Sequence, residues 1–274
     1  MRFLCVLSLF ISITGCDLSR QKKVTSELNL GLHAFQQKSI DLRTLENEFR
    51  KTEVIKVQND PVYHKTKIYN CVDLNELLKK HFDLKSLNLS DYKMVFECID
   101  GYKPEMPLEK LMGAKAYLAI SDASAPKGEK WEEIRKDGHL MNAAPFYVVY
   151  TGISPEDGSY KWPYNLTKVH IKPLNSDLTL TLPKQTSAKP GLDLFQKHCK
   201  TCHAVNGVGG EMGPELNYPK NITEYWHRAD LEAFIKNPAA YRNNVRMPTL
   251  TLSDIEIGLL VDYLQVMKNQ KISE

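Results

Sequence analysis

The five residues Cys199-Lys200-Thr201-Cys202-His203 constrain this chain more than any other part of its sequence. The pattern C-x-x-C-H is the attachment motif of a c-type haem, in which both thiols form thioethers with the haem and the histidine binds the iron. A zinc site would need a second pair of ligands, and no Cys or His pair follows at metal-ligand spacing. A redox dithiol would follow a strand, whereas Leu192, Phe195 and Cys199 recur at helical spacing before this motif. The motif therefore predicts one covalently attached haem c.

Haem iron that transfers electrons usually has a second axial ligand, and a methionine sulfur raises the reduction potential. The methionines near or after the motif are Met141, Met212, Met247 and Met267. Met212 follows His203 too closely to reach the other haem face easily, and Met267 lies in a helical pattern. Met247 lies in the polar stretch Asn243–Pro248, whose final proline stiffens the loop. We therefore expect His203 and Met247 to be the axial ligands.

From about Ala188 to Lys268, the chain resembles a class I cytochrome c domain. Residues on both sides of the motif carry this resemblance: Gly191, Phe195, Gly213-Pro214-Glu215-Leu216, Met247-Pro248, Leu260 and Tyr263-Leu264. The resemblance implies an all-α domain over residues 190–274, in which Gly191 permits a close crossing with the last helix. It also implies that the Pro214 carbonyl accepts a hydrogen bond from Nδ1 of His203 and so orients the ring.

The last helix is predicted without reference to any family. Ser253 and Glu256 have the spacing of a capping box, and Leu252 with Ile257 can form a hydrophobic staple. The apolar face of the helix would consist of Ile257, Leu260, Val261 and Leu264. Gly258 inside this helix costs stability relative to alanine, and a close packing contact is one reason for a glycine there.

The N-terminus has the pattern of a secretory signal peptide. Arg2 supplies a positive charge, and residues 3–13 are apolar but too few to span a bilayer. The closing residues Ile13-Thr14-Gly15-Cys16 resemble the lipobox of bacterial lipoproteins, in which the cysteine is lipidated after cleavage. We expect residues 1–15 to be removed and Cys16 to carry the lipid, the alternative being an ordinary signal peptide with an incidental cysteine. No later segment is long and apolar enough to span a membrane.

These features predict a membrane-anchored lipoprotein of the bacterial periplasm, and they leave open which membrane holds it. The polar residues 16–38 would form a tether between the lipid and the folded part. Cys5 would leave with the signal peptide, so Cys71 and Cys98 are the cysteines without an assigned role. An exported compartment allows these two thiols to pair, but they could equally be separate buried thiols.

Residues 39–182 alternate strand-like and helical patterns. The strand candidates are Val54–Val57, Lys67–Tyr69, Met94–Ile99, Tyr117–Ile120, Phe146–Tyr150 and Val169–Ile171. Asp73–Phe82 predicts a short helix and Asp100-Gly101 predicts a turn. The polar residues 183–189 would link this middle domain to the cytochrome-like domain. The predicted fold class is therefore α+β, with a mixed domain followed by an all-α domain.

The middle domain resembles the molybdopterin-binding fold of sulfite oxidases in reduced form. Short motifs carry this resemblance: Tyr69–Leu74 with Leu77-Leu78, Asp100–Tyr102, Pro107-Leu108, Pro145–Val149 and Trp162–Tyr164. In active members of that family the cysteine that binds the metal precedes the first motif, and here no cysteine stands between Cys16 and Cys71. The histidines of this domain show no paired metal or catalytic spacing: His64, His81, His139 and His170. We therefore expect neither molybdenum nor a bound molybdopterin.

The sequence thus predicts an exported monohaem cytochrome c that passes single electrons between redox proteins, with a middle domain that docks a partner or places the haem. One alternative is an enzyme with molybdopterin, an oxidoreductase coupled to the haem; another is a redox sensor or ligand-binding module. A net charge of +3 is too small to indicate nucleic acid. It leaves room for a basic docking patch near the haem, with Lys197, Lys200 and Arg246 as candidates, or for ordinary solvated surface charge at these positions.

Overall fold

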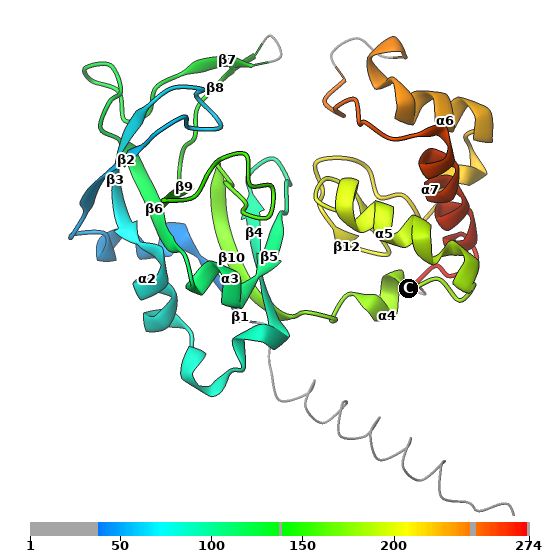
Figure 1. The fold of residues 1–274 in the computed structure, drawn as a ribbon, viewed down its shortest axis with the longest axis horizontal. Helices are drawn as coiled ribbons and strands as arrows, with labels where there is room; N and C mark the ends of the chain where they lie inside the picture. Colours follow the sequence, from blue (N-terminus) through cyan, green and yellow to red (C-terminus); the bar gives the residue numbers. More distant parts are fainter. Residues whose placement is uncertain (1–37, 137–138, 242–244, 273–274) are drawn as a thin grey trace, which may run out of the picture. The chain divides into compact units, whose positions relative to one another are not determined.

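The computed structural model describes residues 38–136, 139–241 and 245–272 (Figure 1). The expected signal peptide, the lipidation site Cys16 and the tether up to residue 37 lie outside the described residues, as do Asn243 and Asn244 of the expected ligand loop. The chain from Lys38 onward forms one compact unit.

Two antiparallel sheets of four strands form most of the first half of this unit (Figure 1). The first sheet has the order β1-β10-β4-β5, with β1 at Lys38–Asp41, β10 at Leu166–Pro173, β4 at Tyr92–Cys98 and β5 at Glu105–Pro107. The second sheet has the order β2-β3-β6-β9, with β2 at Glu53–Val57, β3 at Lys67–Asp73, β6 at Lys115–Asp122 and β9 at Tyr147–Thr151. A separate pair consists of β7 at Ile134–Lys136 and β8 at His139–Met141.

The strand patterns explain which faces are buried. In β2, Ile55 and Val57 are buried while Val54 is 68 % exposed, which is the period-two alternation of a strand with one solvated face. β3 alternates in the same way over Lys67–Cys71, whereas β9 is buried along most of its length, as expected for a strand covered on both sides. All six strand candidates of the sequence are confirmed as β2, β3, β4, β6, β9 and β10, with small shifts at their ends.

The short helices of this half cover the sheets. The predicted helix is α2, Leu74–His81, and it begins at Asp73, whose carboxylate accepts a hydrogen bond from the Glu76 amide at 2.9 Å. The other α-helices here are α3 at Leu108–Met112 and α4 at Leu178–Thr181. Three 3-10 helices connect strands, at Leu42–Glu48, Leu84–Ser86 and Leu89–Asp91. The chain from Lys38 to Thr181 is therefore α+β, as the sequence predicts, and we call it the α+β half.

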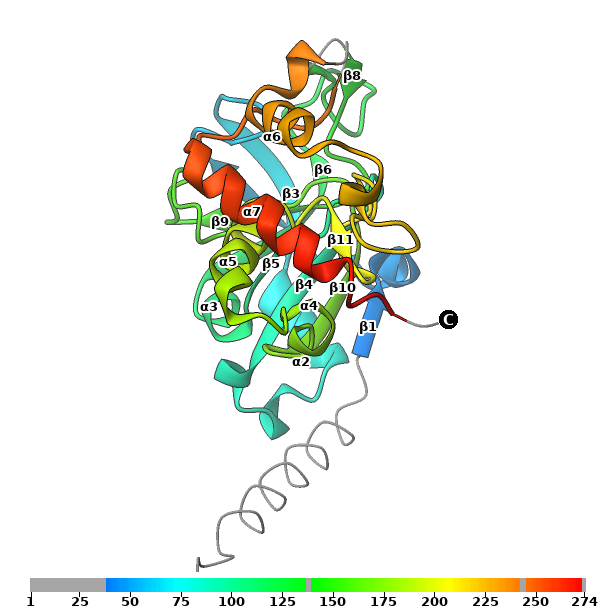
Figure 2. The same ribbon diagram turned by 90° about the vertical axis from the view of Figure 1, so that its right-hand side faces the viewer.

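Helices dominate the second half (Figure 2). They are α5 at Lys189–His198, α6 at Arg228–Lys236 and α7 at Asp254–Met267, with 3-10 helices at Thr186–Ala188, Ile222–Glu224 and Pro238–Ala240. A two-residue hairpin, β11 at Ala204–Val205 with β12 at Val208–Gly209, follows α5. The predicted capping box of α7 is present, with the Ser253 and Glu256 side chains each bonded to the other's backbone amide. The stretch expected to be a linker contains a helical turn, and Pro190 lies in the first turn of α5, where proline is tolerated.

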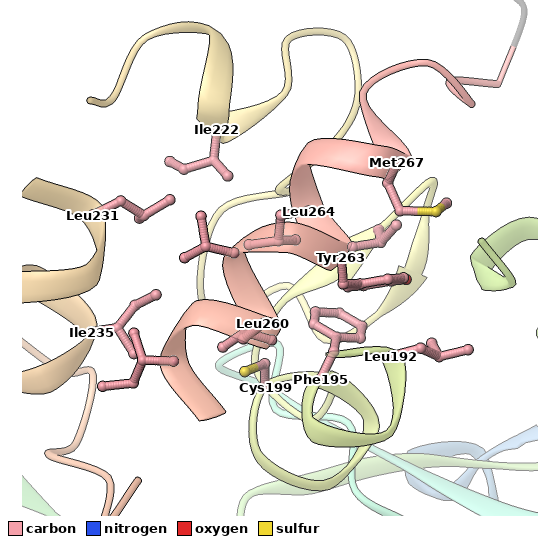
Figure 3. Close-up of a cluster of buried hydrophobic side chains, with 13 residues drawn as sticks. Leu192, Phe195, Cys199, Ile222, Leu231, Ile235, Leu260, Tyr263, Leu264 and Met267 are labelled. Atoms are coloured by element: carbon pink, nitrogen blue, oxygen red, sulfur yellow. The ribbon is translucent and has the colours of Figure 1, made fainter. Parts of the chain in front are cut away.

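A single apolar core joins α5, α6 and α7 (Figure 3). The Phe195 ring of α5 packs on the Tyr263 ring of α7, with 5.7 Å between ring centroids. Tyr263 also donates a hydrogen bond from its hydroxyl to the Thr181 carbonyl at 2.9 Å, so this buried polar group has a partner. Met267, one of the methionines that follow the motif, is 1 % exposed and lies in this core.

The crossing of α5 and α7 depends on Gly191. A Cβ added at this position would lie 2.1 Å from the Leu259 carbonyl oxygen and 2.6 Å from Cβ of Tyr263. Gly258 on α7 is different, because an added Cβ would meet only the Arg228 guanidinium at 3.6 Å, an ordinary contact. The glycine inside the last helix therefore has no close packing contact, and the close approach occurs at Gly191.

This difference gives a matched pair of variants. We expect Gly191→Ala to lower the free energy of unfolding by about 1–3 kcal/mol, because the two helix backbones must separate. We expect Gly258→Ala to raise it by about 0.5–1 kcal/mol, because alanine loses less backbone entropy in a helix. Urea unfolding of both variants measures the two changes, and equal effects at the two positions would contradict this account of the crossing.

Cys71 and Cys98 are both free thiols in the structure. Cys71 lies on β3 in one sheet and Cys98 at the end of β4 in the other, and both are buried. Burial, followed by nearby carboxylates, raises the pKa of each thiol well above its usual range. Of the two alternatives left open by the sequence, the structure shows separate buried thiols.

Candidate haem-attachment site

The end of α5 places the attachment motif. The Cys199 and Lys200 amides both donate to the Phe195 carbonyl, at 2.9 and 2.8 Å, which ends the helix. The Cys202 and His203 amides then donate to the Cys199 carbonyl, at 3.0 and 2.9 Å, so the chain turns tightly within the motif. In this turn Cys199, Cys202 and His203 come to line one cavity.

The cavity has a volume of about 320 Å³ and its wall is mostly apolar. The motif and α5 form one side, α7 contributes Leu260 and Leu264, and α6 contributes Leu231, Phe234 and Ile235. In Figure 3 the Cys199 sulfur points away from Phe195, toward the side on which Leu231 and Ile235 lie. An apolar cavity with a few polar groups at fixed positions is the usual form of a cofactor site.

His203 is held in one orientation. Its Nδ1 lies 2.8 Å from the Pro214 carbonyl oxygen, an acceptor, so the proton is on Nδ1 and Nε2 is left free to bind a metal. Burial lowers the pKa of His203, although the Pro214 carbonyl opposes this, and the ring is thereby kept neutral as a ligand must be. Pro214 is thus where the resemblance to cytochromes placed it.

Gly213 forms the wall behind this ring. A Cβ added at Gly213 would lie 2.3 to 2.7 Å from three atoms of the His203 ring. The Gly213 amide also donates to the Cys202 carbonyl at 2.8 Å, which ties the loop to the motif. Any larger residue at this position would push the imidazole out of its place, so the glycine is part of the site.

Burial also sets the state of the two thiols. It raises the pKa of Cys199 to about 12, with a further contribution from Cys202. It raises the pKa of Cys202 as well, with Asp100 adding to the shift. Both side chains are therefore neutral and line the cavity as small apolar groups.

Two methionines line the cavity, Met212 and Met247. Met247 also packs against the core of α5, α6 and α7, and its neighbours Arg246 and Pro248 share the lining. Met212 directly precedes Gly213, which lies against the His203 ring, so it enters the cavity from the histidine side of the loop.

The other two methionines considered as ligands lie elsewhere. Met141 lies on β8, in the α+β half, and Met267 lies in the core. The axial role of Met247 stays a prediction that this placement supports.

Several lining residues were not foreseen from the sequence. His198 lines the cavity beside the motif, and burial lowers its pKa. Trp226, Phe234 and Tyr241 pack as a cluster, with ring centroids 5.2 Å apart for the first two and 5.9 Å for the last two. The signal for this wall was the helical spacing of Leu231, Phe234 and Ile235, which predicts the apolar face of α6.

Three buried asparagines hold the loop that follows the motif. Asn221 donates to Asn217 at 2.6 Å and to the Leu264 carbonyl of α7 at 2.8 Å, and Asn217 donates to Asn206 at 2.8 Å. Asn206 in turn donates to the Leu180 and Gln270 carbonyls, each at 2.8 Å. This chain of amides fixes the loop against α7 and so fixes the position of Pro214. No local sequence pattern indicates it, because its members are spread along the chain.

One charge assignment from the sequence is wrong. Lys200 is only 8 % exposed, so it belongs neither to an exposed docking patch nor to ordinary solvated surface. Its ammonium binds carboxylates of the α+β half, which sequence spacing could not show. Lys197 and Arg246 are exposed and remain candidates for docking.

Two histidines of the α+β half lie against carboxylates. Nε2 of His81 is 3.0 Å from a Glu48 carboxylate oxygen, and Nε2 of His170 is 3.1 Å from a Glu97 carboxylate oxygen. Within the described ranges, no group of three or more His, Cys, Asp or Glu side chains could hold a metal ion. None of the helices that the structure describes is long and apolar enough to cross a membrane.

Comparison with known families agrees with the site. Residues 186–264 match the model of the family described as cytochrome C oxidase, cbb3-type, subunit III. No curated protein and no solved structure matches the chain. The C-terminal part of the chain is therefore a cytochrome c domain. The protein is a haem-containing electron-transfer protein, and a domain of this kind exchanges electrons with redox proteins.

The residues present fit haem c. Two thiols and an oriented, neutral imidazole converge on one apolar cavity, and a glycine leaves room for the ring beside them. Cys199 and Cys202 would hold the vinyl groups, and His203 would hold the iron through Nε2. Both methionine sulfurs that line the cavity could provide the second axial ligand.

Proposed function

We propose that the protein is an exported, lipid-anchored monohaem cytochrome c that transfers single electrons between redox proteins of the bacterial periplasm. The observation that carries the proposal is the convergence of Cys199, Cys202 and His203 on one apolar cavity that Met247 also lines. When bound, haem c supplies a one-electron couple at this position. The expected signal peptide and Cys16 supply the export and anchoring parts of the proposal.

The protein's own residues would set the properties of this centre. The Pro214 carbonyl holds the His203 ring and increases its basicity through the hydrogen bond at Nδ1. The apolar wall from α6 and α7 limits water at the iron, which disfavours the more highly charged ferric state. A thioether from Met247 would favour the ferrous state further. The apolar wall and the thioether therefore suit a carrier of high potential, while the more basic imidazole opposes them by stabilising ferric iron.

The α+β half is proposed to act through docking or haem placement, without a metal reaction of its own. Cys71 is buried among the aromatic side chains of the second sheet, and burial keeps it protonated. The described residues before it contain no other cysteine that could take the place of a metal thiolate. These observations favour an electron carrier over a molybdopterin oxidoreductase, and they leave a sensor role as the second candidate for this half.

Covalent attachment is the main test. Protein produced in a host that matures c-type cytochromes and has ample molybdenum should keep its haem through acid-acetone extraction. It should contain about one iron per chain, as a single motif implies, and negligible molybdenum. The double variant Cys199→Ala with Cys202→Ala should lose covalent haem entirely. Extractable haem in the unaltered protein, or stoichiometric molybdenum, would contradict the proposal.

The second axial ligand can be assigned by a matched pair of methionine variants. Met247→Ala should abolish the weak sulfur-to-iron charge-transfer band of the oxidised protein and lower the reduction potential, because thioether ligation stabilises ferrous iron. Met212→Ala, which removes the other cavity methionine, should keep the band. Visible spectroscopy and redox titration of both variants decide the assignment, and the reverse pattern would make Met212 the ligand.

Anchoring is tested at Cys16. We expect Cys16→Ser to shift the protein from the membrane fraction to the soluble fraction, or to stop its processing, because the acylated residue is lost. Fractionation after a high-salt wash measures the shift, and Cys5→Ser serves as the control within the signal peptide. Equal membrane retention of the two variants would show that another feature holds the protein there.

A further inference from the structure

Lys200 lies inside the attachment motif but binds the α+β half. Its ammonium is 2.8 Å from a Glu105 carboxylate oxygen on β5 and 2.7 Å from an Asp177 carboxylate oxygen just before α4. Lys93 on β4 binds the same two carboxylates, at 3.0 and 2.5 Å. Two ammonium groups and two carboxylates thus form a closed cluster, which we call the Lys200 cluster.

The two lysines of the Lys200 cluster are shielded from water, whereas the Glu105 side chain is 34 % and the Asp177 side chain 15 % exposed. Lys200 is 8 % and Lys93 4 % exposed. Burial alone would raise the pKa of Asp177, but the two lysines outweigh it and hold the pKa well below its usual range. Burial would lower the pKa of Lys200, and Glu105 with Asp177 raises it instead. Removing one member of a buried ion pair leaves the other charge without a partner, which is strongly destabilising. The lysines and carboxylates of this cluster are therefore held in a defined geometry.

The turn between β4 and β5 adds backbone contacts to the same loop. The Lys103 amide donates to the Thr201 carbonyl of the motif at 2.9 Å, and the Glu211 amide donates to the Gly101 carbonyl at 2.8 Å. Nζ of Lys103 lies 2.5 Å from a Glu211 carboxylate oxygen. Segments from both halves therefore exchange backbone hydrogen bonds.

The turn approaches the backbone of the loop closely. Gly101 has a φ of +84°, and a Cβ there would lie 2.6 Å from the Glu211 carbonyl carbon and 2.7 Å from the Met212 amide nitrogen. Burial, followed by the neighbouring Cys202, raises the pKa of Tyr102 to about 12. The turn therefore covers the side of the attachment loop that carries Thr201, Cys202 and Met212.

We propose that the α+β half positions the haem: the Lys200 cluster and the turn at residues 100–103 fix the attachment loop, exclude water from it and thereby raise the reduction potential. Lys200, Glu105 and Gly101 are positioning residues in this arrangement, because they act through the loop and not on the iron. The inference rests on the proposed function, since it requires an attached haem.

A positioning role and a direct effect of charge predict different signs for the shift in reduction potential. Lys200→Met removes a positive charge and Glu105→Gln removes a negative one, so a direct electrostatic effect would shift the potential in opposite directions. Loss of positioning admits water to the loop in both variants, and water stabilises the ferric state. We therefore expect both variants to lower the potential. Gly101→Ala, which changes no charge, should lower it too.

The experiment is a redox titration of the full chain with its covalent haem. We expect each variant to change the equilibrium constant for oxidation about tenfold, the lower range of typical coupling between sites, which corresponds to 59 mV for one electron. Lys200→Arg should keep most of the reduction potential of the unaltered protein, because the positive charge that binds the two carboxylates is retained. As a control, Lys189→Met changes an exposed lysine at the start of α5, the helix that precedes the motif, and should leave the potential unchanged.

The outcomes separate the two proposals. If the unaltered chain carries no covalent haem, the proposed function fails and this inference fails with it. If haem is attached but Lys200→Met and Glu105→Gln shift the potential in opposite directions or not at all, only the positioning role is overturned. Should Gly101→Ala fail to fold, the two charge variants still decide, because their signs differ between the two explanations.

Discussion

The tight turn at the end of α5 is the constraint on which the site depends. Two amides share the Phe195 carbonyl and two more share the Cys199 carbonyl, so a few backbone bonds bring both thiols and the imidazole to one cavity. This turn can reach the cavity only because Gly191 lets α5 lie directly on α7. Gly213 then leaves space for the His203 ring, and Pro214 orients it. Gly191, Gly213 and the Pro214 carbonyl therefore determine the position of the His203 ring.

The α+β half is the second constraint on the same loop. A cytochrome c domain that stood alone would have to leave the Lys200 side chain in water or fold it back on itself. Here Glu105 and Asp177 bind that ammonium in a cluster with Lys93, and the turn at Gly101 exchanges backbone hydrogen bonds with the loop. The α+β half is thus in contact with the part of the chain that would hold the haem.

The sequence was informative where chemistry or periodicity is local. The motif, the capping box at Ser253, the start of α2 at Asp73 and the main strands were all predicted from short patterns, and the structure has them. It was uninformative for β1, β5, β7 and β8, which are too short to show an alternation. It also gave the wrong environment for Lys200, because the carboxylates that bury it lie far away along the chain.

The sequence by itself determined that this chain carries a haem-attachment motif at the end of a helix, since thiol spacing and helical period are properties of adjacent residues. Only the tertiary structure decided what surrounds that motif: an apolar wall from α6 and α7, two methionines in one cavity, three asparagines that hold the loop, and a buried ion cluster shared with the α+β half. Such contacts join residues far apart in the chain, and their energies depend on burial, which no local pattern encodes.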